Sequence, residues 1–380
     1  MKGLSFNNLS SILSTAVLFF SLYAGERQAH LPQKGWYAAD QEKLITNILE
    51  YDRKARGRYA APGVSDVQAV IVSHAGHSYS GVYAAAGIRL LDPKKIKKII
   101  VLAPCHSLLP LNTAVFVTDE ASYTVPNGTL LLNQAAAKKL VSADKIVQYG
   151  KSLGVKNPFD FEHSMEIQLP FIKHYLPDAV VLPILVGSQL STKEIRAVSQ
   201  LIADYIDDQT ALIVSSDWIH YGKDYSFYPF LNDQHAFEKI CALTNTIMQP
   251  IFNQSLDECI QVFDATHANV CGRAPLQLFL ALLEKNVFKK KLSAYLIAYA
   301  TSVDDKVTFD SAVSYATVAF APPLLNQSIP SLTNYERLSL KTYARSVLRW
   351  AVEGNRENVK SLIISPALQK KCGTFVTLTD

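Results

Sequence analysis

The sequence lacks the glycine-rich loops that bind phosphate: it contains neither a Walker-type loop nor a GxGxxG segment. Because such loops depend on closely spaced glycines, this absence argues against a phosphate-binding loop of either type. Neither sign of charge is in large excess, since the formal net charge is only +4 over 380 residues. The densest basic run, residues 94–98, precedes an apolar segment and is interpreted as a solvated turn, so we expect no nucleic-acid partner.

Cysteines are few, and no two of the five stand in CxxC spacing. The odd count and this spacing argue against a disulfide framework and against a zinc ribbon. The composition, 49% hydrophobic and 18% charged, is typical of a compact globular protein. A chain of 380 residues is long enough for one large α/β domain or for two domains.

Strand-like apolar runs recur along the chain, and helical segments separate several of them. The strand-like runs are Val67–Val72, Ile99–Leu102, Val180–Val186, Ala211–Val214, Leu292–Ala298 and Ala312–Phe320. The helical segments are Asp40–Tyr51, Leu131–Leu140, Glu166–Tyr175, Thr192–Ile206, His235–Met248 and Pro275–Glu284. Uninterrupted apolar runs indicate strands that are buried on both faces. The alternation predicts a three-layer α/β domain over residues 30–322, with a mostly parallel sheet and helices on both faces.

The amino-terminal residues 1–25 differ in character from this domain. They carry Lys2 and an apolar stretch from Ile12 to Leu22, followed by small residues, a pattern that resembles a secretory signal. The alternative is a disordered or membrane-skimming extension on a cytoplasmic protein. We therefore expect either a cytoplasmic protein or export through a weak signal, and no membrane association outside this segment.

The carboxyl-terminal residues 331–380 also change character. They begin with a capping box, Thr333-Asn334-Tyr335-Glu336, which opens a helical pattern, and they end on a strand-like run, Gly373–Leu378. A segment of this size with one strand cannot build its own core. It predicts either the opening of a further domain or a segment that docks on the first.

Three of the apolar runs lead directly into segments that carry histidine. His74 follows the first run, His106 the second and His220 the fourth. In an open parallel sheet, the carboxyl ends of the strands face a common crevice in which ligands bind. We therefore expect these side chains to converge although they lie far apart in the sequence.

His74, His106 and Cys271 form a candidate metal site. Imidazole and thiolate together suit late first-row metals such as iron, copper or zinc. Cys271 precedes an amphipathic helix, so the helix amino terminus and nearby Arg273 are expected to lower the pKa of its thiol. Three ligands with open positions are typical of a catalytic metal. The alternative is that the histidines complete core hydrogen bonds and Cys271 is an inert thiol; only the shared placement at strand ends favours the metal.

Two further clusters could supply acid–base groups. Asp217 and His220 stand three residues apart, which places them on one face if a helix follows the strand directly, with Asp217 orienting His220. The alternative is a helix-capping Asp217 and a His220 in an exposed loop. In the second cluster, Glu162 or His163 could reach the cleft while Ser164 caps a helix. Capping by Ser164 alone would require no function.

Several short motifs follow one another along the chain. They are Gly35-Trp36-Tyr37-Ala38-Ala39-Asp40, His74-Ala75-Gly76, Ala103-Pro104-Cys105-His106, Glu162-His163-Ser164-Met165-Glu166, Val186-Gly187, Ser216-Asp217-Trp218-Ile219-His220, Cys271-Gly272-Arg273 and Asp310-Ser311-Ala312-Val313-Ser314-Tyr315-Ala316. Together they resemble the Memo family, the B component of the AmmeMemoRadiSam set, over nearly all of residues 30–320. The tail, including Ser365-Pro366-Ala367-Leu368, resembles the start of an AMMECR-type domain, so residues 331–380 are expected to be a truncated segment of that type.

The resemblance implies a fold similar to class III extradiol dioxygenases, which use non-haem iron(II). It implies one mononuclear iron or copper site on His74, His106 and Cys271, with zinc as another candidate metal. It also places His220, with Asp217 beside it, where the dioxygenase-like scaffold has its acid–base histidine. Expected partners are a small molecule or peptide in the cleft, and AMMECR-type and radical SAM proteins of the same set.

This chain departs from the family pattern at three positions beside the candidate ligands. Ser73 stands where proline is frequent, His77 where tyrosine is usual, and Cys105 where serine commonly precedes the second histidine. The extra thiol of Cys105 could ligate the metal, oxidise or pair with Cys271.

Three functions remain open from the sequence. The first is metal-dependent redox chemistry, as in a non-haem oxidoreductase; the thiolate of Cys271 in place of a carboxylate favours copper or thiolate redox chemistry over ring cleavage. The second is a non-catalytic binding or adaptor module that uses the same cleft. The third is sequestration of copper or iron.

Overall fold

The computed structural model describes residues 25–61, 63–106, 113–153, 157–230, 236–303 and 309–323, together with Leu340. The strands are β1 (Glu26–Gln28), β2 (Ala69–Val72), β3 (Lys98–Pro104), β4 (Val115–Val117), β5 (Ser122–Val125), β6 (Gly128–Leu131), β7 (Val147–Tyr149), β8 (Val180–Val186), β9 (Thr210–Ser215), β10 (His220–Gly222), β11 (Ser293–Thr301) and β12 (Ser311–Ala321). The α-helices are α2 (Gln41–Arg58), α3 (His77–Ile88), α4 (Gln134–Ala143), α5 (His163–Glu166), α6 (Leu169–Tyr175), α7 (Thr192–Ala203), α8 (Ala236–Asn253), α9 (Leu256–Thr266) and α10 (Arg273–Glu284). Short 3-10 turns are η2 (Pro32–Lys34), η3 (Gly150–Leu153), η4 (Pro158–Asp160) and η5 (Lys223–Tyr225).

Within the described residues, the main sheet has nine strands in the order β10-β12-β2-β9-β3-β8-β4-β7, with β11 also paired to β12. The central strands β2, β9, β3 and β8 run parallel. On either side of them, β12 pairs with β2 and β4 pairs with β8 in antiparallel fashion. The prediction of a mostly parallel sheet is confirmed for the central strands, and the flanks add antiparallel strands.

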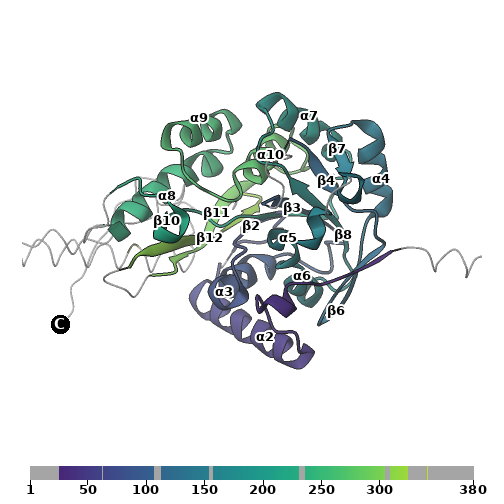
Figure 1. Ribbon diagram of the computed structural model, residues 1–380, viewed down its shortest axis with the longest axis horizontal. Helices are drawn as coiled ribbons and strands as arrows, with labels where there is room; N and C mark the ends of the chain where they lie inside the picture. The colour runs from purple at the N-terminus through teal and green to yellow at the C-terminus, as the bar shows by residue number, and fades with distance from the viewer. Residues whose placement is uncertain are drawn as a thin grey trace, which may run out of the picture.

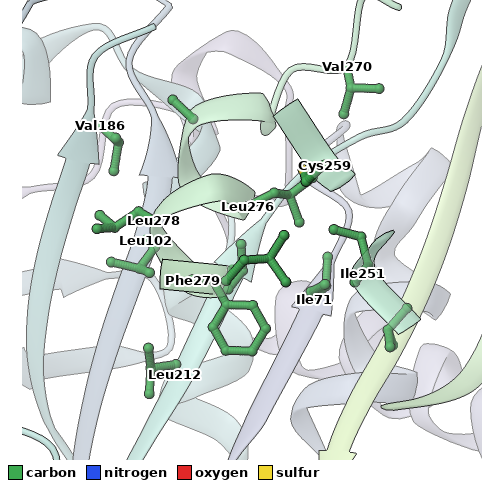
Figure 2. Packing of buried hydrophobic residues seen from close by; sticks show 14 of the residues in the cluster. Ile71, Leu102, Val186, Leu212, Ile251, Cys259, Val270, Leu276, Leu278 and Phe279 are labelled. Carbon is green, nitrogen blue, oxygen red and sulfur yellow. The ribbon is translucent and has the colours of Figure 1, made fainter. Parts of the chain in front are cut away.

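Helices cover both faces of this sheet, as the alternation of strands and helices predicted. In Figure 1, α2, α3 and α6 lie on one side of the sheet, and α7, α9 and α10 lie on the other. Each side has its own cluster of buried apolar side chains. On the second side, Figure 2 shows Leu276, Leu278 and Phe279 of α10 over the strands. Ile71, Leu102 and Leu212 belong to those strands and to the same buried cluster. Burying a side chain of this size stabilises the fold by about 1.5–3 kcal/mol, so the two clusters hold the three layers together.

Helix boundaries follow the local capping signals. The carboxylate of Asp40 accepts a hydrogen bond from the Lys43 amide at the start of α2, and Ser191 and Glu194 form a capping box at the start of α7. The predicted first helix ends too early, because the structure continues it to Arg58. Helix α9 and the small-residue helix α3 were not predicted.

Helix α3 was missed because its residues pack by close approach rather than by an apolar stripe. A side chain at Gly87 would lie 2.6 Å from Val72 Cγ1, so glycine lets the helix rest directly on β2. His77 is the first residue of α3 and is buried, with its Nε2 3.0 Å from the Ile167 carbonyl oxygen. The segment that follows His74 is therefore fixed against the sheet.

The segment before α2 is fastened to the core by the buried carboxylate of Glu166. Glu166 accepts hydrogen bonds from the hydroxyls of Tyr37 (2.8 Å) and Tyr123 (2.6 Å) and from the Leu31 amide (2.8 Å). His30 Nδ1 lies 2.5 Å from the same carboxylate. Strand β1 also pairs in parallel with β5, in a second sheet of three strands with the order β1-β5-β6. The amino-terminal part of the described chain thus contacts the helices around the strand ends.

The expectations for the two ends of the chain lie outside the described residues. Residues 1–24 and, apart from Leu340, residues 324–380 are not described, so the signal-like and AMMECR-type assignments and the domain boundaries stay predictions. In the part of the chain that is described, no helix has both the length and the apolar character needed to span a membrane.

Candidate functional site

His74, His106 and Cys271 converge at the carboxyl ends of the parallel strands. One ligand atom from each residue lies within 4.8 Å of the others. His74 follows β2, His106 follows β3, and Cys271 precedes α10. The imidazole centroids of the two histidines are 5.4 Å apart. The expectation that the strand ends bring these side chains together therefore agrees with the geometry.

Hydrogen bonds determine which nitrogen of His74 carries the proton. The Ser215 hydroxyl donates to the Ser164 carbonyl at 2.6 Å, and the Ser215 hydroxyl oxygen lies 3.0 Å from His74 Nδ1. Because the hydroxyl has only one proton, its oxygen must accept the proton of Nδ1. Burial, followed by the charges of neighbouring histidines, keeps the pKa of His74 well below its usual value. Its Nε2 is buried and has no hydrogen-bond partner among the described residues, as expected for a ligand atom.

His106 is oriented by a carboxylate. Glu162 is buried, and its Oε1 lies 2.9 Å from His106 Nδ1 while its Oε2 accepts the His106 amide at 2.5 Å. Burial alone would raise the pKa of Glu162, but the hydrogen bond and charge of His106 outweigh it and lower the pKa to about 2. The ionised carboxylate holds the proton on Nδ1 and leaves Nε2 of His106 available to a metal.

His220 contacts the thiol of Cys271. Its Nδ1 lies 2.9 Å from the Trp218 carbonyl oxygen and 3.1 Å from that of Asn269, and carbonyl oxygens only accept. The proton is therefore on Nδ1, and the basic Nε2 lies 3.5 Å from Cys271 Sγ. The Asn269 side chain also bonds both backbone groups of His220. In this arrangement His220 can accept the proton that the thiol releases.

The expected lowering of the Cys271 pKa is wrong. Burial raises the pKa of the thiol, and the charges of Asp217 and Glu162 raise it further. Arg273 does not compensate, because its guanidinium pairs with Asp264 at 2.6 Å. Cys271 is therefore a protonated thiol until a cation supplies the missing positive charge.

No helix follows Asp217, so the predicted shared helical face with His220 is wrong. Residues 216–219 are irregular and lead into β10, which starts at His220. The buried Asp217 carboxylate instead accepts the His74 amide at 2.9 Å. Burial raises the pKa of Asp217 to about 6, against the lowering effect of the amides of His74 and Ala75. Asp217 thus holds the backbone of the first candidate ligand rather than the ring of His220.

The second predicted cluster is also arranged differently from expectation. Glu162, rather than Ser164, caps α5 by accepting the Ser164 amide at 3.0 Å. Ser164 instead donates its hydroxyl proton to the Pro104 carbonyl at 2.7 Å. The ring of His163 stacks on that of His106 with centroids 4.8 Å apart. Glu162 and His163 therefore both contact the His106 ring.

Cys105 does not take part in the three-residue cluster. It is buried, its amide donates to the Val186 carbonyl at 3.0 Å, and it forms no disulfide with Cys271. Of the roles that the sequence left open for this thiol, pairing with Cys271 is not present in this structure.

Sequence reasoning missed two residues that orient the histidines, Ser215 and Asn269. Ser215 directly precedes the motif that begins at Ser216, and Asn269 lies two residues before Cys271, so each was next to a motif rather than within it. It also missed that Gly150-Lys151-Ser152-Leu153-Gly154 has the letters of a GxSxG motif. Ser152 lies on the 3-10 turn η3 instead of a strand-to-helix elbow, so that match indicates no nucleophile.

The donor set fits a late first-row metal. His74 offers an unprotonated Nε2, His106 offers the ring nitrogen that is not bonded to Glu162, and Cys271 offers a thiol beside a base. Mixed imidazole and thiolate ligands suit copper, iron or zinc better than calcium or magnesium, which prefer oxygen.

The family model and the related sequences indicate one family. A family model for Memo-like proteins matches residues 33–319. MEMO1 family protein C4H3.04c of Schizosaccharomyces pombe is 27% identical over 308 residues, which cover 74% of this chain and 95% of that protein. MEMO1 family protein SSO0066 of Saccharolobus solfataricus is 29% identical over 298 residues, which cover 75% and 96%. Among solved structures, an uncharacterized protein from Escherichia coli K12 aligns with a TM-score of 0.40 at 16% identity, over 67% of this chain and 99% of that one.

Proposed function

This chain belongs to the family of Memo-like proteins, and we propose that it binds one iron or copper ion on His74, His106 and Cys271 and uses it in redox chemistry. The observation that carries the proposal is the convergence of two imidazole rings and a thiol, with one donor atom of each within 4.8 Å of the others. A bound ion of this class would supply one-electron chemistry and a Lewis-acidic position open to a small ligand.

The chain's own residues have separate tasks in this proposal. Ser215 and Glu162 orient the two histidines, so that the Nε2 atoms face the ion without reorganisation. His220 accepts the proton that Cys271 loses on binding the ion, since its Nε2 is unprotonated and 3.5 Å from the sulfur. Asp217 fixes the backbone of His74. Each of these groups acts on a ligand rather than on a substrate.

Elemental analysis of protein purified anaerobically from iron- and copper-replete cells tests the proposal. The wild type should carry about one equivalent of iron or copper more than Cys271→Ser protein does. Cys259→Ala is the matched control, because Cys259 is a buried thiol on α9 outside the three-residue cluster. Metal-free wild-type protein, or equal metal in Cys271→Ser, would refute the proposed site.

Redox activity is tested separately from binding. Loaded protein should reduce oxygen in the presence of a reductant, and Cys271→Ser protein should not. Stoichiometric metal without any turnover would instead favour the sequestration of iron or copper.

A second candidate function, a binding module, is favoured by the aromatic side chains near the site. Tyr79, Phe161 and Tyr225 are exposed large apolar residues. Tyr79 is in the first turn of α3, Phe161 precedes Glu162, and the Tyr225 ring lies 4.9 Å from that of His220. Exposed aromatic groups around a cleft are typical of surfaces that bind peptides or small molecules. Ligand binding that persists in metal-free Cys271→Ser protein would support this function.

A further inference from the structure

A second group of donor atoms lies on the other side of the His106 ring. His106, Glu162 and His163 each offer one ligand atom, and these atoms lie within 4.8 Å of one another. His163 Nδ1 is 3.4 Å and His106 Nδ1 is 2.9 Å from the same oxygen, Glu162 Oε1. Cys271 and His74 contribute nothing to this group, so it is a separate set of donors that shares only His106 with the site above.

The two separations at Glu162 Oε1 suit a small divalent ion. Zinc bonds of about 2.0–2.1 Å place neighbouring ligand atoms about 2.9 Å apart at a right angle and about 3.4 Å apart at the tetrahedral angle. The His106–Glu162 and His163–Glu162 distances match these values. Side-chain exposures of 32% for His106 and 25% for His163 leave an approach from solvent.

The charge and softness of this group differ from those of the first site. Glu162 is ionised, while burial, opposed by the charge of Glu162, lowers the pKa of His163 to about 4, so its imidazole is neutral at pH 7. Two imidazoles and one carboxylate form a nitrogen and oxygen donor set without sulfur. Such a set prefers zinc or iron(II), whereas the thiolate of the first site suits soft cuprous ions.

From this geometry we propose that His106, Glu162 and His163 form a second metal site, for a divalent ion of the zinc or iron(II) class. In the absence of that ion, the proton on His106 Nδ1 occupies its place and bonds Glu162. Binding would shift this proton to His106 Nε2, which the first site does not use in Cys271→Ser protein, and Glu162 Oε1 would be free to hold the ion while Oε2 keeps its bond to the His106 amide. The site does not depend on Cys271.

The test replaces the imidazole of His163 by an aromatic ring without nitrogen. His163→Phe retains the stacking on His106 and on Trp36, whose ring centroids lie 4.8 and 4.5 Å from that of His163. Zinc binding is measured by competition with a chromophoric chelator at pH 7 in Cys271→Ser protein, with and without His163→Phe. His174→Ala in the same background is the control, because His174 lies outside both groups of donors.

We expect Cys271→Ser protein to bind about one equivalent of zinc, and the double variant to bind it at least about tenfold more weakly. Equal zinc affinity in the two proteins, or no zinc in Cys271→Ser, would overturn the second site. His163→Ala serves as a second variant, with thermal unfolding to verify the fold of each protein.

Cobalt spectroscopy separates this outcome from the fate of the first site. Sulfur-to-cobalt charge transfer reports only the Cys271 site, so His163→Phe alone should retain this absorption and Cys271→Ser should lose it. Loss of the absorption in His163→Phe would overturn the independence of the two sites. Absence of the absorption in the wild type would refute the first site. The second site would still be tested by the zinc competition, which does not involve Cys271.

Discussion

Replacing Glu166 by glutamine should destabilise the whole fold, although Glu166 lies outside both groups of candidate ligands. Its carboxylate is fully buried and accepts from Tyr37, Tyr123 and the Leu31 amide, while His30 Nδ1 lies 2.5 Å away. Every one of these neighbours is a donor. A glutamine side chain has one acceptor oxygen, and its amino group would face donors at the other position.

The size of the effect follows from these contacts. Hydrogen bonds to a charged group contribute about 1.5–3 kcal/mol each, and they are not additive around one carboxylate. Removing one partner from a buried charged cluster costs about 3–5 kcal/mol, and we expect this range for Glu166→Gln. For a chain of this size, the midpoint of thermal unfolding should fall on the order of 10 °C.

Urea unfolding at pH 7, followed by circular dichroism, measures the change. Tyr37→Phe removes a single bond to the same carboxylate and should lose about 1.5–3 kcal/mol. Glu50→Gln is the control on an exposed glutamate, and its unfolding midpoint should not move. A free energy of unfolding for Glu166→Gln within about 1 kcal/mol of the wild-type value would contradict this reasoning. Glu166 would then not be the main contact that holds the segment before α2 against the core.

The pH dependence gives an independent check of the same carboxylate. Burial alone would raise the pKa of Glu166, but hydrogen bonds from His30 and Tyr123 outweigh it and lower the pKa. A lowered folded pKa means that the stabilisation is complete above the ordinary glutamate pKa and is lost as the pH falls through the folded value. The stability difference between wild type and Glu166→Gln should therefore shrink on acidification, and a constant difference down to the acid transition would contradict this reasoning.

Three further predictions concern the site and its thiols. Glu162→Gln should weaken cobalt binding at the Cys271 site by about 10–100-fold, measured by chelator competition, because the neutral amide holds the His106 ring less firmly; Asp160→Asn is the exposed control. Ser215→Ala should weaken the same binding by about tenfold, since His74 Nδ1 loses its acceptor; unchanged affinity would mean that packing alone orients the ring. Burial raises the pKa of Cys259 to about 12, so at pH 8 its thiolate fraction should be about 10³-fold below that of the unfolded chain. Peptide mass spectrometry after iodoacetamide treatment checks this, and alkylation as fast as in urea would contradict it.

The location of the candidate site could be predicted from the sequence because it depends on simple periodicity. Apolar runs such as Val180–Val186 identified the parallel strands, and parallel strands share one carboxyl edge. His74 and His106 follow such runs immediately, so their convergence needed only the order of the elements. Helix α3 could not be found in this way, because its small residues show no apolar stripe, and its close packing on β2 depends on the three-dimensional contact at Gly87.

The ionisation of the site could not be predicted, because it is set by residues far away in the sequence. Arg273, two positions from Cys271, pairs with Asp264, whereas the charges of Asp217, after β9, and Glu162, at the start of α5, raise the pKa of the thiol. A neighbour in sequence is thus a poor guide to a pKa, since burial and through-space charge dominate it. The same holds for proton placement on the histidines: His74 is 141 positions from the serine that fixes its tautomer. Motifs predict which side chains lie at the strand edge. The packing of distant segments sets the protonation state of each one, and so whether it acts as a base, an acid or a ligand.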